Sequence, residues 1–144
     1  MERLRGTCVA IDGAGVLLRG PSGSGKSDLA LRLIDVGACL VSDDYTCAEA
    51  AGGAVTASAP EALAGLLEVR GIGVLRMPAK ASVRLDLVID LVDGDSVERM
   101  PAPDSVEILG VRLPYYRLTA LEPSSASKVR AVVGLVCGRI VSVE

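Results

Sequence analysis

The eight residues 20–27, GPSGSGKS, constrain the fold of this chain more than any other segment, because they match the pattern G-x-x-x-x-G-K-S. An apolar run at residues 16–19 precedes them, and residues 27–36 follow with leucine and isoleucine at helical spacing among charged residues. When a glycine-rich turn joins a strand to a helix, the backbone N–H groups of the turn and the positive end of the helix face the same place, which can hold an anion. The segment therefore predicts a phosphate-binding loop in an α/β domain.

Each residue type in this loop has a chemical role. The glycines allow the turns that point N–H groups at a phosphate. Lys26 supplies a mobile positive charge for the β- and γ-phosphates of a nucleotide, and Ser27 supplies a hydroxyl ligand for Mg²⁺. The predicted nucleotide-binding residues are Gly20, Pro21, Ser22, Gly23, Ser24, Gly25, Lys26 and Ser27.

Two adjacent aspartates, Asp43 and Asp44, end the next apolar run, residues 38–42. Ligands of a parallel α/β sheet sit at the carboxyl ends of its strands, so we expect this pair to lie near Lys26 and Ser27. Neighbouring residues of a strand point in opposite directions, so the two carboxylates should differ in role. One can take part in the outer shell of a metal, and the other can accept a proton from an incoming hydroxyl.

A carboxylate and a guanidinium, Glu68 and Arg70, lie two residues apart on a predicted strand and so share one face. They could serve metal and phosphate respectively, with Gly71 allowing the segment to flex. A surface ion pair has the same spacing, so the spacing alone leaves both interpretations open.

Asp90 ends the apolar run 87–89 and resembles the metal-binding aspartate of a Walker B strand. The alternating pattern of residues 83–92 favours a different interpretation, in which this is an edge strand with Asp86 and Asp90 in solvent.

Composition narrows the chemistry further. The 144 residues include no histidine, asparagine or glutamine, which excludes Ser-His-Asp and Cys-His nucleophiles, histidine-containing zinc sites and a GTPase switch. A net charge of −3 does not indicate nucleic-acid binding, and four cysteines without a C-x-x-C pair fit buried thiols in a reducing compartment. No apolar run reaches the length of a membrane span, and Asp12 interrupts the apolar stretch near the N-terminus. We expect a cytoplasmic protein that binds neither membrane nor nucleic acid.

The remaining pattern predicts one α/β domain over residues 1–144 with few helices. Residues 7–11 and 16–19 should pair as a hairpin through Asp12 and Gly13. The other expected elements are strands at 66–69, 72–77, 83–92, 108–113 and 115–118, a helix at 126–134 and a loop at 93–107. Residues 50–59 are small and predict a turn region, a loop with short pieces of strand.

These segments together resemble the kinase domain of HPr kinase/phosphorylase, the bacterial enzyme that phosphorylates a serine of the phosphocarrier HPr. The similarity runs through residues 4–6, 13–44 and 67–74 and more loosely through 97–101, and it is greatest to the short alphaproteobacterial versions that lack a separate N-terminal domain. The resemblance implies a P-loop kinase domain of the HPr kinase/phosphoenolpyruvate carboxykinase-like type, with a mixed sheet and few helices.

The resemblance also implies ATP and Mg²⁺ as cofactors, an HPr-like phosphocarrier protein as partner, and a homo-oligomer, since members of the family are often hexamers. The implied site consists of Lys26 on phosphate, Ser27 and Glu68 on Mg²⁺, Asp44 as the base for the substrate serine, Arg70 on the transferring phosphate, and Arg99 as a further active-site arginine.

Arg5 stands where the family usually has a histidine beside the catalytic aspartate. A permanent cation there makes Asp44 a weaker base, or binds phosphate directly, so Arg5 joins the catalytic candidates. The family's Gly-Arg-Asn segment, which is tied to dephosphorylation, has no match around residues 124–130, so we expect the kinase reaction rather than the reverse phosphorolysis. Two alternatives stay open: a catalytically impaired ATP-binding regulator and a small-metabolite kinase.

Overall fold

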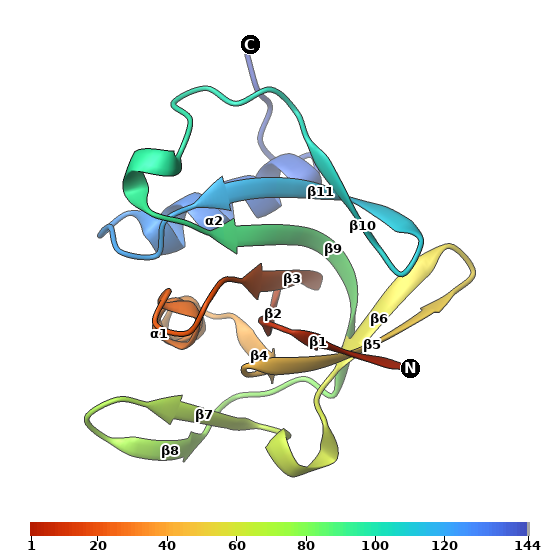
Figure 1. Ribbon diagram of the computed structural model, residues 1–144, viewed down its shortest axis with the longest axis vertical. Coiled ribbons are helices and arrows are strands. Elements are labelled where there is room, and N and C mark those ends of the chain that lie inside the picture. Colours follow the sequence, from red (N-terminus) through yellow and green to blue (C-terminus); the bar gives the residue numbers. More distant parts are fainter. Residues whose placement is uncertain (144) are drawn as a thin grey trace.

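A computed structural model describes residues 1–143, in which a nine-stranded mixed sheet and a two-stranded sheet accompany two α-helices (Figure 1). The helices are α1 (Lys26–Asp35) and α2 (Ser125–Val136), and two short 3-10 turns are η1 (Glu61–Leu63) and η2 (Gly94–Ser96). The strands are β1 (Glu2–Arg5), β2 (Thr7–Ile11), β3 (Ala14–Arg19), β4 (Cys39–Ser42), β5 (Tyr45–Ala51), β6 (Ala54–Ser58), β7 (Leu66–Val69), β8 (Gly73–Arg76), β9 (Ser82–Leu91), β10 (Ser105–Ile108) and β11 (Val111–Leu118). This is the α/β class with a mixed sheet and few helices that the sequence predicts.

The direction of the strands decides where a site can form. In the order β1-β5-β6-β9-β3-β2-β4, β3 runs parallel to β9, and β9 runs parallel to β11. β2 runs antiparallel to both β3 and β4, so β4 points the same way as β3. The carboxyl ends of β4, β3, β9 and β11 therefore meet at one edge of the sheet.

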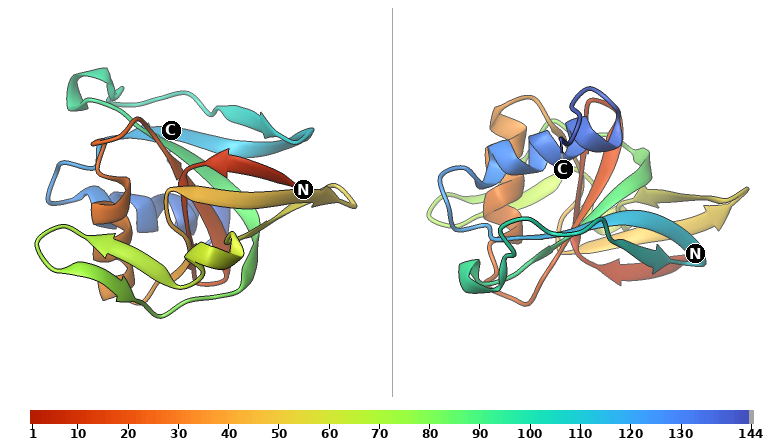
Figure 2. Two further views of the ribbon diagram at one scale, coloured as in Figure 1. Left: turned by 60° about the horizontal axis from the view of Figure 1, so that its bottom comes forward. Right: turned by 90° about the horizontal axis from the view of Figure 1, so that it is seen from above.

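The two helices cover one face of this sheet and lie side by side (Figure 2). α1 contributes Leu29 and Leu33, and α2 contributes Val129 and Val133, to a core shared with alternate residues of the central strands. The other residues of the same strands fill a second core, against β5, β6, β10 and β11. Because both faces are buried, β2 and β3 read in the sequence as unbroken apolar runs.

The predicted elements up to residue 42 agree with the structure to within about two residues, and so do β7, β9 and α2. The turn region expected at 50–59 is more regular than predicted: β5 and β6 form an antiparallel hairpin there, closed by Gly52 and Gly53 with φ of 60° and 79°. Small alanine-rich side chains carry little strand signal, and pairing within the sheet decides the outcome instead.

The expected single strand at 108–113 is wrong, because a turn at Leu109 and Gly110 divides it between β10 and β11. β10 begins at Ser105, inside the segment predicted as a loop. Nor is β9 an edge strand, since it pairs with β3 and β11 as well as β6. Within residues 1–143, no helix is long and apolar enough to cross a membrane.

Candidate functional site

The glycine-rich loop leaves β3 at Gly20 and enters α1 at Lys26. Gly25 caps the helix with φ 94°, a left-handed conformation that favours glycine. A β-carbon at this position would also come 2.8 Å from Ala120 Cβ, so the segment after β11 packs directly against the loop. The backbone of the loop thus requires glycine here for two independent reasons.

Lys26 is only 6 % exposed and turns back into the loop. Its Nζ donates to the carbonyl oxygens of Gly20, at 2.7 Å, and Pro21, at 3.2 Å. In residues 1–143 no carboxylate pairs with this ammonium group. A buried cation held only by neutral carbonyls, beside the amino end of a helix, makes this loop electropositive and suited to an anion.

Asp43 lies beside the loop, as the sequence predicts. Ser27 Oγ donates to Asp43 Oδ1 at 2.8 Å, and Thr7 Oγ1 donates to the same oxygen at 3.0 Å. The backbone N–H of Asp44 in turn donates to Thr7 Oγ1 at 3.1 Å. One buried hydroxyl therefore fixes both aspartates.

Thr7 belongs to this cluster, although nothing in the sequence predicts it as a site residue. It is 0 % exposed, and it begins the apolar strand β2. A threonine at the start of an apolar run is typical of ordinary strands, so the sequence offers no signal that distinguishes this hydroxyl.

Arg5 joins the loop to the second aspartate. Its Nη2 donates to Ser22 Oγ at 3.0 Å, and its Nε lies 3.9 Å from Asp44 Oδ1. The guanidinium also lies 5.6 Å from the centre of the Tyr45 ring. Asp44 has φ 65°, and this turn directs its carboxylate away from Asp43 toward Arg5. The two aspartates thus have different partners.

Three of the predicted site residues do not join this cluster. Glu68 is exposed on β7, in the small sheet that packs against α1, and Arg70 follows it in the turn to β8. Arg99 is exposed in the segment between η2 and β10. The side chains of these three residues make no hydrogen bond or ion pair among the residues described, and the described chain contains no group of three or more Cys, His, Asp or Glu that could hold a metal.

Asp90 is engaged rather than free in solvent. Arg19 donates to it from Nε at 2.7 Å and from Nη2 at 3.1 Å, and the Tyr115 hydroxyl donates at 2.6 Å. Burial, followed by the effects of Asp90, raises the pKa of Tyr115, which keeps the phenol protonated as a donor. The network fixes Arg19, the residue directly before the loop, so the interpretation of Asp90 as a solvated edge residue is wrong.

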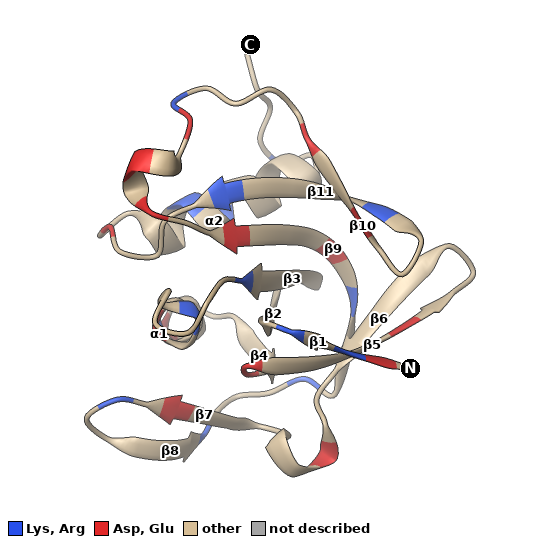
Figure 3. Ribbon diagram, in the orientation of Figure 1, with Lys and Arg blue, Asp and Glu red and all other residues tan. Residues whose placement is uncertain are grey.

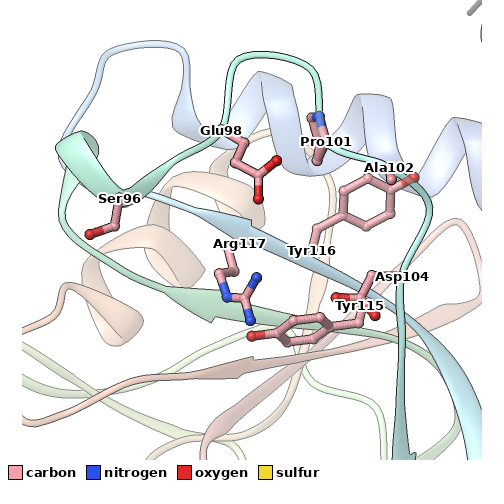
Figure 4. Close-up of a pocket in the computed structure, with 8 residues that line it drawn as sticks. All are labelled: Ser96, Glu98, Pro101, Ala102, Asp104, Tyr115, Tyr116 and Arg117. Atoms are coloured by element: carbon pink, nitrogen blue, oxygen red, sulfur yellow. The ribbon is translucent and has the colours of Figure 1, made fainter.

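Charges of alternating sign end the three parallel strands, as Figure 3 shows. Arg19, Asp90 and Arg117 are cross-strand neighbours at the carboxyl ends of β3, β9 and β11. Beyond them a pocket opens between β11 and the segment after η2 (Figure 4), and Tyr116, Glu98 and Arg117 take part in its lining.

A strand, a glycine-rich loop and a helix whose first residue is a buried lysine define a class of α/β proteins that bind phosphate groups. The family model described as "HPr Serine kinase C-terminal domain" matches residues 1–133. The chain belongs to this family.

Individual relatives agree with this assignment. The chain is 32 % identical over 144 residues to the HPr kinase/phosphorylase of Malacoplasma penetrans, covering 92 % of this chain and 48 % of that protein. It is 40 % identical over 121 residues to the HPr kinase/phosphorylase of Caldicellulosiruptor bescii, covering 76 % and 39 % respectively. The chain thus spans less than half of the length of these curated relatives.

The fold has a counterpart among solved structures. The Hpr(Ser) kinase/phosphatase from Coxiella burnetii superposes with a TM-score of 0.83 over 92 % of this chain and 94 % of that chain, at 24 % sequence identity. The mixed sheet with its two helices is therefore the fold of this family.

Proposed function

We propose that residues 1–144 act as one ATP- and Mg²⁺-dependent kinase domain that phosphorylates a serine of an HPr-like phosphocarrier protein. The observation that carries the proposal is the cluster beside the loop that buries Lys26, in which Ser27 donates to Asp43 and Arg5 contacts both Asp44 and Ser22. Membership of the family supports an HPr-like protein as the acceptor of the phosphate. The family resemblance further supports a cytoplasmic homo-oligomer.

The loop would hold the phosphates of ATP. Lys26 supplies the charge at its centre, and the N–H groups at the start of α1 supply further donors. Ser27 presents a hydroxyl oxygen that would ligate Mg²⁺, and Asp43, which accepts a hydrogen bond from it at 2.8 Å, would act in the outer shell of the ion. When bound, the ion offsets negative charge on the transferring phosphate.

Glu68 and Arg70 take their proposed roles from the family resemblance. Both would have to reach the phosphates from the β7–β8 hairpin, which projects as a separate two-stranded sheet (Figure 1). We propose Glu68 as the second metal ligand, Arg70 as the arginine that neutralises the transferring group, and Arg99 as a further active-site arginine.

Asp44 is the proposed base. The serine Oγ forms a bond to the γ-phosphorus while the bond from that phosphorus to the β-γ bridging oxygen breaks, and ADP leaves. The hydroxyl proton passes to the Asp44 carboxylate. The side chain of Asp44 is 53 % exposed, which leaves it accessible to a protein acceptor.

One contact favours a second candidate function. Arg5 Nε lies 3.9 Å from Asp44 Oδ1, so a fixed cation stands beside the carboxylate that a substrate hydroxyl has to reach. A protein with this pair could bind ATP and regulate a partner while transferring phosphate slowly or not at all.

Intact-mass measurement of HPr after incubation with the chain, ATP and Mg²⁺ tests the two candidates. The kinase predicts a shift of one phosphate that Asp44→Asn abolishes and Lys26→Ala prevents through loss of ATP binding. The regulator predicts ATP binding that Lys26→Ala removes, with no shift in HPr. A shift that persists in Asp44→Asn would contradict the assignment of the base.

A further inference from the structure

The sheet order separates the reacting end of a bound nucleotide from its other end. Asp43 and Asp44, the proposed metal and base residues, follow β4 and so lie on the β2–β4 side of β3, and Arg5 lies 3.9 Å from Asp44. The γ-phosphate of a nucleotide in the loop must point to that side. Its nucleoside must then extend to the opposite side, over the carboxyl ends of β9 and β11.

A pocket lies in that position. β11 is two strands from β3, a distance of roughly 10 Å at the usual strand spacing, and its last residues border the pocket in Figure 4. The pocket also takes in Glu98 and Asp104. Two carboxylates disfavour a phosphate there but accept hydrogen bonds from amino and hydroxyl groups, so the pocket suits the uncharged part of a nucleotide.

Arg117 offers a stacking surface in this pocket. Its guanidinium lies 5.1 Å from the centre of the Tyr115 ring, so its planar group is held in place by the ring beneath it. Among the residues described, no carboxylate or other acceptor takes a hydrogen bond from it. A guanidinium plane with free donors can stack on a base.

Leu121 lies beside the loop, in the segment that follows β11. Its side chain is 78 % exposed, which is unusual for a leucine so close to a site, and it follows the residue that packs on Gly25. A β-carbon at Gly25 would lie 3.9 Å from Leu121 Cδ2. An apolar side chain here can cover the ribose or base of a nucleotide whose phosphates occupy the loop.

We propose that the carboxyl ends of β9 and β11 form the subsite for the nucleoside of ATP, with Arg117 stacking on the base and Leu121 covering it. This inference rests on the proposed function, because it requires the triphosphate to occupy the Gly20–Ser27 loop.

Calorimetric titration with two Mg²⁺-bound ligands, ATP and tripolyphosphate, tests the subsite. Arg117→Ala and Leu121→Ser each remove one contact to the nucleoside and should weaken ATP binding about tenfold, the order of one stacking contact. Tripolyphosphate binding should stay unchanged in both variants. Arg112→Ala is the matched control, since Arg112 lies at the other end of β11 and, in the part of the chain that the structure describes, its side chain donates to Ser105 Oγ alone.

The outcomes distinguish this inference from the function on which it rests. Equal weakening of both ligands, or no change in ATP binding, would overturn the subsite while leaving the kinase intact. Failure of the unaltered protein to bind either ligand would overturn the proposed function and the subsite with it. Both variants alter exposed side chains, and circular dichroism confirms that each has the native fold before titration.

Discussion

Ser27 Oγ donates a hydrogen bond to Asp43 Oδ1 across 2.8 Å, although the strands that lead to these residues are not neighbours. β2 lies between β3 and β4 and runs antiparallel to both. Two antiparallel steps restore the direction of the chain, so the carboxyl ends of β3 and β4 face the same edge. In a parallel sheet, neighbouring strands have their carboxyl ends at the same edge. Here β3 and β4 reach the same arrangement although the antiparallel strand β2 lies between them.

Asp43→Asn tests whether this pair binds the metal. The amide retains the size of the side chain but loses the negative charge that Asp43 would place in the outer shell of Mg²⁺. We expect ATP affinity in the presence of Mg²⁺ to fall by about 10- to 100-fold, as for an outer-shell partner of a metal. ATP affinity in EDTA should change much less. An equal loss with and without Mg²⁺ would show that Asp43 serves the loop structure instead.

Thr7→Val tests the shared hydroxyl with little change of volume. The substitution leaves the N–H of Asp44 without its acceptor and removes one donor from Asp43, so we expect a loss of about 1–3 kcal/mol in the free energy of unfolding. We also expect a lower rate of phosphate transfer at unchanged ATP affinity, because the position of Asp44 changes and the loop does not. Thr7→Ser keeps the hydroxyl and should restore the rate. Urea unfolding and single-turnover assays measure the two effects, and a serine variant as slow as the valine variant would disprove the positioning role.

The sequence predicts the elements whose signals are local. The glycine-rich loop, the helix after it and the Asp12–Gly13 turn each depend on residues within a few positions of one another, and the structure has all three. The proximity of Asp43 to Ser27 also follows, because it requires only that two strands point the same way.

The features that the sequence does not predict share one physical cause. Each depends on residues that are distant in the chain and become neighbours only in the folded protein. Asp90 resembles a solvated residue until Arg19 and Tyr115, 71 and 25 residues away, are placed beside it. Thr7 is 36 residues from Asp43, and its hydroxyl has no local partner to reveal its role. β5 and β6 consist largely of small residues, so only pairing with β1 and β9 makes them strands.

Gly15→Ala tests the close packing of the two central strands. A β-carbon at Gly15 would lie 2.4 Å from the backbone oxygen of Arg84, and neither strand can move without disturbing the core. We expect a loss of at least about 1–3 kcal/mol in the free energy of unfolding, as for overpacking in a core. Gly94→Ala is the control, since a β-carbon there meets nothing within 4 Å. Similar unfolding midpoints for the two variants would contradict this account.

Cys8 should make the protein less stable at alkaline pH. Burial raises the pKa of its thiol from 9.0 to about 12, so between these values the unfolded chain loses a proton that the folded chain retains. The free energy of unfolding should therefore fall as pH rises from about 9 to 12, and Cys8→Ala should reduce this slope. In the native state Cys137, which is exposed, should react readily with a thiol reagent, whereas Cys8 should react only on unfolding. An unchanged alkaline slope in Cys8→Ala would count against this contribution.

Arg5→His tests whether the fixed cation limits the base. A histidine side chain changes its charge near pH 6.5 and is mostly neutral at pH 7. It is also too short to keep the 3.0 Å hydrogen bond that Arg5 donates to Ser22 Oγ. Above this pH the variant has no cation beside Asp44, so we expect faster transfer to serine than with arginine; below it the imidazolium restores the cation and the advantage shrinks. The ratio of the variant rate to the original rate should therefore rise between about pH 5.5 and 7.5. Arg3→His on the same strand is the control, because Arg3 is exposed and its side chain makes no hydrogen bond or ion pair within residues 1–143. A ratio that stays flat with pH, or that Arg3→His reproduces, would place the effect of Arg5 in phosphate binding rather than on the base.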